Sequence, residues 1–174
     1  MNKIKKYIRD IPDFPEPGIG FKDITPLLAN PDAFHQTIDT LKIRHQNHSI
    51  DMVVGIEARG FIFASALAYA LEAGTCLVRK LGKLPHTTYQ KTYDLEYGTD
   101  TLEIQTDAFG PGQRILIVDD VLATGGTVAA TVELIRNHFE VEIVEIDFLM
   151  ELMFLNGRAK LANLPIHSLL EYSD

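Results

Sequence analysis

Apolar positions along this chain form short runs that alternate with longer segments of helical periodicity. The short runs, which predict buried strands, lie at 51–55, 75–79, 114–118, 141–150 and 166–170. The segments of helical periodicity lie at 3–9, 32–45, 60–72 and 128–138, and a short helix is expected to begin at Asn156 or Gly157 and to end at Leu161. Strands that alternate with helices predict an α/β fold whose parallel sheet has right-handed crossovers and helices on its faces.

Two segments depart from this alternation. Residues 10–31 are rich in proline, and we expect an irregular loop there, followed by a helix that Asp32 caps. The segments 92–95 and 101–105 flank Gly98-Thr99-Asp100, which predicts a β-hairpin. Because no repeat or linker interrupts the chain, residues 1–174 are expected to form one domain.

Composition limits the classes to which the protein can belong. The 174 residues are 46% apolar and 23% charged, as in a globular domain with a full core. The single cysteine, Cys76, lies in an apolar run, which indicates a reducing compartment, and the N-terminus lacks the apolar region of a secretory signal. The longest apolar stretch, at 61–71, has about half the length of a membrane span. We therefore expect a cytoplasmic protein that does not bind a membrane.

The formal net charge of −8 argues against nucleic acid as a partner, because binding there depends on a basic surface. Basic side chains are nevertheless concentrated locally. Arg79, Lys80 and Lys83 lie close together in the sequence, and Arg59 stands between Ala58 and Gly60.

The segment 115–127, ILIVDDVLATGGT, carries the strongest chemical signal. A predicted strand ends in Asp119 and Asp120, and a loop of small residues then leads into a helix. Glycines in such a loop let the backbone approach an anion, free N–H groups point at it, and threonine hydroxyls add donors. We expect this loop to bind a phosphate and the two aspartates to lie beside vicinal hydroxyls or a metal ion. The residues of the loop are Ala123, Thr124, Gly125, Gly126 and Thr127.

Several unusual segments end predicted strands: 55–60, 79–83, 119–127 and 151–152. Ligands of parallel sheets bind outside the carboxyl ends of the strands, so we expect these segments to share one edge of the sheet. The Walker and Rossmann glycine motifs are absent, since Phe61 stands where a Walker motif requires lysine. No nucleophilic serine or cysteine arrangement occurs, and all the histidines are interpreted as solvated surface residues.

The segment 115–127 resembles the phosphoribosyl-diphosphate (PRPP) signature of the type I phosphoribosyltransferases. Further segments extend the resemblance, in family order and over nearly the whole chain, to the adenine branch of that family. They are IPDFP at 11–15, Pro17-Gly18, FKDITP at 21–26, GIEARGF at 55–61, VRKLGKLP at 78–85, LEYGTDTLEIQ at 95–105 and GQRILIVDDVLATGGT at 112–127. Ala64 and Leu81 are small departures, at positions where relatives can carry glycine and a basic residue.

The resemblance implies the type I phosphoribosyltransferase fold, a twisted parallel sheet flanked by helices. It adds a base-binding hood at 1–31 and a hairpin flap at 84–105. The implied reaction is purine salvage, in which adenine and PRPP give AMP and diphosphate. It implies Mg²⁺ as the cofactor, bound mainly through PRPP with Asp119 and Asp120 nearby, and a homodimer.

The resemblance also assigns roles to individual residues. The loop 123–127 is expected to hold the 5′-phosphate, and Asp119 and Asp120 to face the ribose in the transition state. Candidates for the diphosphate are Arg59, Arg79, Lys80 and Lys83. Glu57 either orients the Arg59 guanidinium or is an exposed acid at a strand end.

For the base, backbone groups of the loop 19–22, including Ile19 and Lys22, are expected to face the adenine edge. Phe21 is expected to stack on one face of adenine and Leu152 to cover the other. Glu96, beside Tyr97 in the flap, is the candidate proton donor or acceptor at the base.

Two alternative functions remain. A 6-oxopurine or xanthine phosphoribosyltransferase is disfavoured by Val128, because such enzymes usually carry an acidic residue after the PRPP motif. A non-catalytic PRPP- or purine-sensing regulator is disfavoured because no DNA-binding extension or basic face is present.

Overall fold

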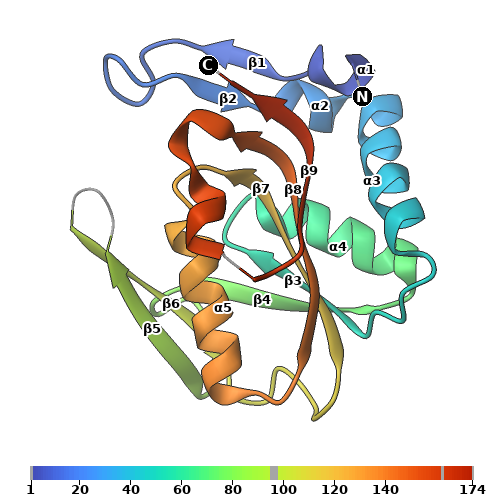
Figure 1. Cartoon of the computed structure of the whole chain (residues 1–174), viewed down its shortest axis with the longest axis vertical. Helices are drawn as coiled ribbons and strands as arrows, with labels where there is room; N and C mark the ends of the chain where they lie inside the picture. Colours follow the sequence, from blue (N-terminus) through green and yellow to red (C-terminus); the bar gives the residue numbers. More distant parts are fainter. Residues whose placement is uncertain (1, 95–97, 162, 174) are drawn as a thin grey trace.

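The computed structural model of the chain describes residues 2–94, 98–161 and 163–173 (Figure 1). Its main feature is a seven-stranded sheet in the order β5-β6-β4-β3-β7-β8-β9. Neighbouring strands from β4 to β9 in this order are parallel, whereas β6 is antiparallel to β4 and to β5. The bounds are β3 Met52–Ile56, β4 Gly74–Lys80, β5 Thr88–Asp94, β6 Thr99–Gln105, β7 Arg114–Leu122, β8 Glu142–Leu152 and β9 Ile166–Tyr172.

Helices cover both faces of this sheet, as the alternating pattern predicts. Helices α3 (Pro31–His45) and α4 (Gly60–Leu71) pack on one face, and α5 (Gly126–His138) packs on the other (Figure 1). Successive strand residues point to opposite faces. Leu116 on β7 therefore packs with α3 and α4, whereas its neighbour Ile117 packs with α5. No helix in the described ranges is long and apolar enough to cross a membrane.

The N-terminal region corrects two predictions. The first helix, α1, spans only Asn2–Lys5, and the segment 10–31 is not irregular throughout. Strand β1 (Arg9–Ile11), which begins one residue before this segment, pairs in antiparallel fashion with β2 (Phe21–Asp23) inside it. Helix α2 (Thr25–Ala29) follows. The prolines are compatible with these elements because they lie in the connection between the strands or in the first turn of a helix, where a backbone N–H is not needed.

The ends of the helices follow local capping rules. Asn30, rather than the predicted Asp32, caps α3: its side chain accepts a hydrogen bond of 2.9 Å from the backbone N–H of Ala33. Helix α4 ends at Glu72, which has a left-handed φ of 59°. Helix α5 begins directly after Gly125, whose φ is 77°.

Two further strands are longer than predicted. Strand β7 runs on to Leu122, so Asp119 and Asp120 lie within the strand and not after it. The extension is held by pairing with β8, in which Asp119 stands opposite Phe148 and Val121 opposite Met150. Strand β5 begins at Thr88; the hairpin that it forms with β6 is the predicted one.

Two short 3₁₀ helices connect β8 to β9. They are η1 (Met153–Leu155) and η2 (Gly157–Leu161), and the second confirms the short helix predicted to end at Leu161. Figure 1 shows them over one end of α5, with which η2 is in contact.

Candidate active site

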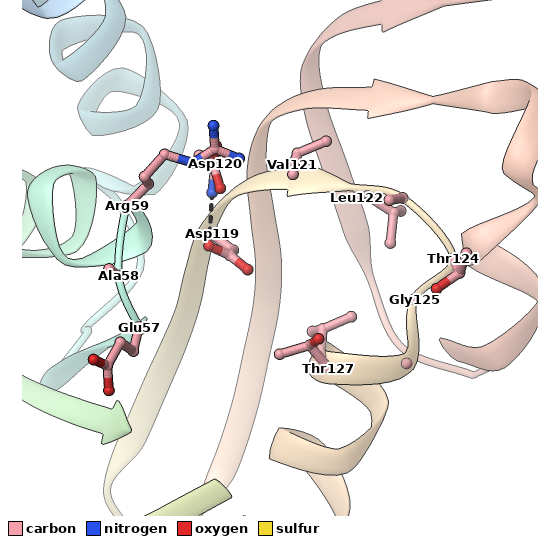
Figure 2. Close-up of a pocket in the computed structure, with 13 residues that line it drawn as sticks. Glu57, Ala58, Arg59, Asp119, Asp120, Val121, Leu122, Thr124, Gly125 and Thr127 are labelled. Carbon is pink, nitrogen blue, oxygen red and sulfur yellow. Dashed lines mark hydrogen bonds and ion pairs between the residues drawn. The ribbon is translucent and has the colours of Figure 1, made fainter. Parts of the chain in front are cut away.

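The carboxyl ends of β3 and β7 and the start of α5 enclose a cavity of about 220 Å³ (Figure 2). The structure thus brings the segment after β3 to the Asp119–Asp120 pair and the predicted phosphate loop. The lining residues are Glu57, Ala58, Arg59, Asp119, Asp120, Val121, Leu122, Ala123, Thr124, Gly125, Gly126, Thr127 and Val128.

The two aspartates have different surroundings because adjacent strand residues point in opposite directions. Asp120 is buried, and its Oδ2 lies 2.8 Å from Nε of Arg59 in an ion pair. The carboxylate of Asp119 points away from Arg59, toward the part of the cavity that Thr127 faces (Figure 2). One Asp119 oxygen accepts a hydrogen bond of 2.9 Å from the backbone N–H of Asp120, and the carboxylate receives no ion pair from a described residue.

This arrangement leaves the pair short of positive charge. Burial raises the pKa of the Asp119 carboxyl well above its ordinary value, and the neighbouring charge of Asp120 raises it further. Burial also raises the pKa of Asp120, although Arg59 acts in the opposite direction. The pocket therefore holds a concentration of negative charge that favours a cationic or hydrogen-bond-donating ligand.

Glycines allow the close contacts that shape this cavity. A Cβ at Gly60, the first residue of α4, would lie 2.7 Å from Asp119 Oδ1 and 2.9 Å from the carbonyl oxygen of Val118. A Cβ at Gly125 would lie 2.5 Å from the carbonyl oxygen of Gly157. Conversely, a Cβ at Gly157 would lie 2.2 Å from the carbonyl oxygen of Ala123. The start of η2 is thus pressed against the loop 123–127, a contact that sequence analysis missed.

The loop 123–127 leads into the N-terminus of α5, where the first backbone N–H groups have no partner within the helix. These N–H groups and the positive end of the helix dipole suit an anion. Hairpin strand β5 contacts the same place, because the hydroxyl of Tyr93 lies 3.2 Å from Oγ1 of Thr127. The loop is therefore enclosed by β5 on one side and by η2 on the other.

The other predicted cations lie outside the lining of this cavity and have their own partners. Arg79 donates two hydrogen bonds of 3.2 Å to Glu57, and Lys80 lies 3.1 Å from Asp100. Glu57 therefore orients Arg79 and not Arg59. Burial tends to raise the pKa of Glu57, but the backbone N–H of Lys80 and the guanidinium of Arg79 outweigh burial and lower it.

Lys83 is exposed, and its backbone is fixed by an acid that the sequence analysis did not select. Glu103, buried on β6, accepts hydrogen bonds of 2.8 Å from the backbone N–H groups of Lys83 and Leu84. These bonds outweigh burial and lower the pKa of Glu103. The available signal was an acidic residue between two apolar ones, LEI at 102–104.

A second, smaller cavity of about 80 Å³ adjoins the first and contains several residues predicted to bind the base. Phe21 and Lys22 from the N-terminal segment line it together with Leu152 from the end of β8. Arg59 lies between the two cavities: it lines both, and its guanidinium carbon is 4.9 Å from the centre of the Phe21 ring. The remaining lining residues are Gly20, Val121, Ala123 and Met150.

Ile19 is not among these lining residues. Its N–H donates to the carbonyl of Glu16 and its carbonyl accepts from the N–H of Phe14, so both backbone groups are used within the loop. The ammonium group of Lys22 pairs with Asp10 and lies 4.3 Å from the centre of the Tyr172 ring. Glu96 and Tyr97 lie outside the described residues, so their predicted roles stay predictions.

Sequence analysis also missed the group that anchors η2. Arg158 donates hydrogen bonds of 2.8 and 2.6 Å to the buried Glu151 at the end of β8, and the hydroxyl of Ser168 on β9 donates to the same carboxylate. This network fixes the segment that carries Gly157 against the loop 123–127.

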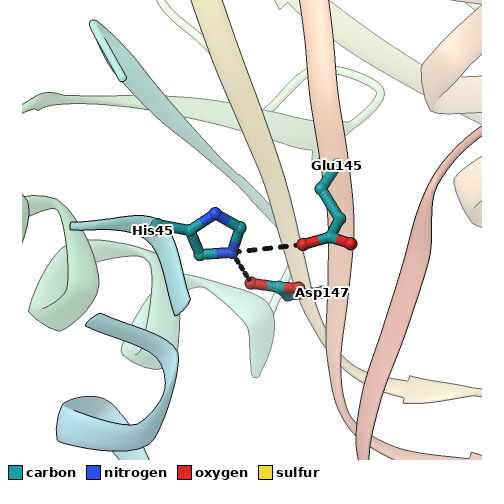
Figure 3. A group of neighbouring side chains, drawn as sticks. All are labelled: His45, Glu145 and Asp147. Atoms are coloured by element: carbon teal, nitrogen blue, oxygen red, sulfur yellow. Dashed lines mark hydrogen bonds and ion pairs between the residues drawn. The ribbon is translucent and has the colours of Figure 1, made fainter. Parts of the chain in front are cut away.

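A second polar cluster, away from the cavities, corrects the prediction for His45 (Figure 3). His45 is fully buried, and its Nε2 lies 2.6 Å from Oδ2 of Asp147 and 3.5 Å from Oε2 of Glu145. Arg44 donates to both oxygens of Glu145, and Nδ1 of His167 lies 3.4 Å from the other Asp147 oxygen. The cluster ties α3 to β8 and β9. The sequence predicted His45 at the surface. That prediction was wrong because the last turn of α3 meets β8, and only the packing of the helix on the sheet shows this.

The fold and the site define a phosphoribosyltransferase. Residues 23–151 match the family model described as the phosphoribosyl transferase domain. The cavity with its paired aspartates and small-residue loop lies inside that region.

Full-length relatives narrow the class. The chain is 56% identical to the adenine phosphoribosyltransferase of Syntrophotalea carbinolica and 58% identical to that of Geobacter metallireducens, each time over 99% of this chain and 100% of the relative. The solved structure of adenine phosphoribosyltransferase from Rhodothermus marinus has a TM-score of 0.92 at 50% identity and covers 98% of this chain and 97% of its own. The Saccharomyces cerevisiae enzyme, solved with an imino-altritol bisphosphate and adenine, has a TM-score of 0.91 at 43% identity and covers 97% of both chains. The chain belongs to the adenine phosphoribosyltransferase family.

Proposed function

We propose that this protein transfers the 5-phosphoribosyl group of PRPP to adenine, giving AMP and diphosphate. The observation that carries the proposal is the pair of adjoining cavities. One presents free N–H groups, threonine hydroxyls and a carboxylate of raised pKa, and the other is a mainly apolar slot between Phe21 and Leu152. A sugar phosphate fits the first and a flat base fits the second, with the anomeric carbon near their junction.

The reaction breaks the bond between C1 of the ribose and diphosphate and forms a bond from C1 to N9 of adenine, which loses its proton. Positive charge develops on the ribose ring as diphosphate leaves. The carboxylates of Asp119 and Asp120 stabilise this charge and hold the ribose hydroxyls. The loop 123–127 binds the 5′-phosphate and thereby places C1 relative to the base. Arg59, which lines both cavities, serves the diphosphate and, by pairing with Asp120, opposes the rise of that carboxyl's pKa that burial causes.

Mg²⁺ fits this site because hard cations prefer oxygen ligands, and Asp119 has no cationic partner among the described residues. Asp119 and Asp120 would lie beside the ion, which PRPP itself would hold. Bound Mg²⁺ would neutralise the charge that develops on the leaving diphosphate.

The rest of the predicted organisation stands as part of this proposal: a single domain, with residues 1–31 as the hood over the base and residues 84–105 as the flap. Arg79, Lys80 and Lys83 serve the diphosphate from the neighbouring strand, and Glu96 exchanges the proton of adenine.

A homodimer is supported by the outer side of α4, where Ile62 is 40% exposed and Tyr69 88% exposed. The buried free thiol of Cys76 supports a reducing location such as the cytoplasm.

The test is to incubate the protein with PRPP and Mg²⁺ and with each of adenine, hypoxanthine, guanine and xanthine. Adenine should be the only efficient acceptor, because a pocket that pairs with a 6-amino group leaves polar groups mispaired when it meets a 6-oxo group. Turnover of hypoxanthine within tenfold of adenine would favour the 6-oxopurine alternative. Binding of PRPP without turnover of any base would favour the regulator.

The role of Glu96 needs its own experiment. If it moves the proton of adenine, Glu96→Gln lowers kcat by about a hundredfold or more and leaves the KM for PRPP nearly unchanged. If the flap only excludes water, the loss is a few-fold and resembles that of Tyr97→Phe. A mild defect would remove the acid–base role and leave phosphoribosyl transfer in place.

A further inference from the structure

The loop 123–127 offers only neutral groups to a phosphate. Its donors are backbone N–H groups and the hydroxyls of Thr124 and Thr127, whereas a phosphomonoester carries a charge of about −1.5 to −2 at neutral pH. The surroundings are acidic, with Asp119 in one adjoining cavity and Asp94 in the other. A protein with a net charge of −8 supplies no general attraction, so a local cation is required.

Three of the cations predicted from the sequence are engaged by acidic side chains. Arg59 is paired with Asp120, Arg79 with Glu57, and Lys80 with Asp100. A cavity of about 710 Å³ on the outer side of the loop is lined by Asp94, Thr124, Gly126, Thr127, Leu155, Asn156, Ala159 and Lys160. Within the described part of the chain, Arg59 and Lys160 are the only basic residues that line either cavity along the loop.

Lys160 lies close to the N-terminus of α5. A Cβ placed on Gly126 would be 3.9 Å from the Lys160 Nζ, so the ammonium group stands beside the first N–H groups of the helix. No carboxylate of the described residues is within ion-pair distance of Lys160, in contrast to Arg59, Arg79 and Lys80.

The position of Lys160 is fixed by its neighbours on η2. Gly157 packs against Ala123 and Gly125 at distances that leave no room for a side chain. Arg158 is held by Glu151 at 2.6 Å, and Leu161 is buried in the core with α5. Lys160 lies between these anchored residues, so its backbone is held over the loop while its ammonium group remains in the cavity.

We propose that Lys160 binds the 5′-phosphate of PRPP and of AMP, and so completes the neutral loop with a positive charge. The proposal rests on the proposed function, since it names the ligand of the same loop. The phosphate would lie between the N-terminus of α5 and the ammonium group, and the lysine would contribute binding of the phosphate rather than chemistry at C1.

The experiment compares Lys160→Met and Lys160→Arg with wild type, and uses Lys42→Met on the distant helix α3 as the control for loss of an exposed lysine. Binding of ribose 5-phosphate, AMP and diphosphate is measured by calorimetry at two salt concentrations, together with KM for PRPP, kcat and the thermal unfolding temperature.

For Lys160→Met, dissociation constants for ribose 5-phosphate and AMP should rise by about tenfold or more, and KM for PRPP should rise with them. Diphosphate binding, kcat and the unfolding temperature should change little. Lys160→Arg should retain most of the affinity and Lys42→Met all of it.

Unchanged affinity for both 5′-phosphates would overturn the proposal, as would a loss confined to diphosphate, which would place Lys160 at the leaving group. An equal loss in Lys160→Met and Lys42→Met would also overturn it, because the effect would then come from net charge alone. If wild-type protein binds neither ribose 5-phosphate nor AMP, the proposed function fails first and this inference fails with it.

Discussion

Two acidic clusters lie on the central strands β7 and β8, and they are compensated in opposite ways. Asp147 contacts His45 and His167, and its neighbour Glu145 contacts Arg44. Burial alone would raise the pKa of Asp147, but the contacts with His167 and His45 outweigh burial and lower it. Among the described residues, Arg59 is the one cation paired with Asp119 and Asp120, and it contacts Asp120 alone; the pKa of both carboxyls is raised.

The difference separates a structural cluster from a binding site. The carboxylates of the cluster around Asp147 have their partners supplied by the protein, from Arg44, His45 and His167, so the cluster stabilises the packing of α3 on the sheet. The Asp119–Asp120 pair is left short of positive charge at the edge of a cavity, so folding holds it in an unfavourable state that a cationic ligand or transition state relieves. Ionisable groups that the fold holds in a cavity with a perturbed pKa are typical of functional sites.

The largest expected effect comes from Asp119→Asn. The change is nearly isosteric and keeps the oxygen that accepts from the Asp120 N–H, but it removes the charge that we propose faces the ribose. We expect kcat to fall by at least about a hundredfold. Because the raised pKa means that the charged form of this carboxyl is unfavourable in the fold, the variant should unfold at a higher temperature than wild type. Steady-state kinetics and calorimetry on one preparation test both parts. A variant with near wild-type kcat would make this carboxylate structural.

The opposite result is expected for Asp147→Asn. The variant weakens the contacts with His45 and His167 in the interior, so the free energy of unfolding should fall by about 1–3 kcal/mol. Activity per folded molecule should change less than twofold at 25 °C, because Asp147 does not line either cavity. Denaturant unfolding gives the first value and active-site-normalised kinetics the second. A large loss of kcat without loss of stability would show that the two clusters are coupled.

The pH dependence of stability should distinguish the same two variants. Asp119 has a raised pKa, so its charge destabilises the fold above that pKa and the penalty disappears as pH falls through it. The advantage of Asp119→Asn over wild type should therefore shrink as pH falls through the raised pKa toward the ordinary value of 3.8. Asp147 has a lowered pKa, so its contribution is complete above the ordinary value of 3.8 and is lost only as pH falls further. The share of the Asp147→Asn deficit that comes from the lowered pKa should disappear only as pH falls below that ordinary value. Unfolding curves at several pH values check both signs.

The smallest effect is expected for Arg44→Met. The Arg44 side chain is 41% exposed, so its pair with Glu145 is partly screened by solvent and its loss should cost about 1 kcal/mol or less. The control is Arg114→Met, which removes a pair whose acid, Glu142, is 56% exposed, together with a hydrogen bond to the carbonyl oxygen of Ser49. It should cost about 1 kcal/mol or less as well. If Arg44→Met is no worse than Arg114→Met, then His45 and His167 alone compensate the cluster.

Much of the fold could be predicted from the sequence because local patterns carry it. The alternation of apolar runs with amphipathic segments marked the strands and helices of the main sheet. The segment 115–127 marked the strand, loop and helix of the candidate phosphate site. The predicted element bounds were wrong where pairing with another strand determines the local structure. Pairing with β8 extends β7 through Asp119 and Asp120, and pairing between β1 and β2 orders the proline-rich segment.

By itself, the sequence determined the fold class, the candidate phosphate loop, the paired aspartates and the family to which the chain belongs, because these are encoded in contiguous residues. Only the tertiary structure decided which charges meet. It paired Glu57 with Arg79, gave Arg59 to Asp120, buried His45 against Asp147 and brought Lys160 to the start of α5. Each of these contacts joins residues that are distant in the chain, and electrostatic interactions depend on separation in space and on burial, which no local pattern records.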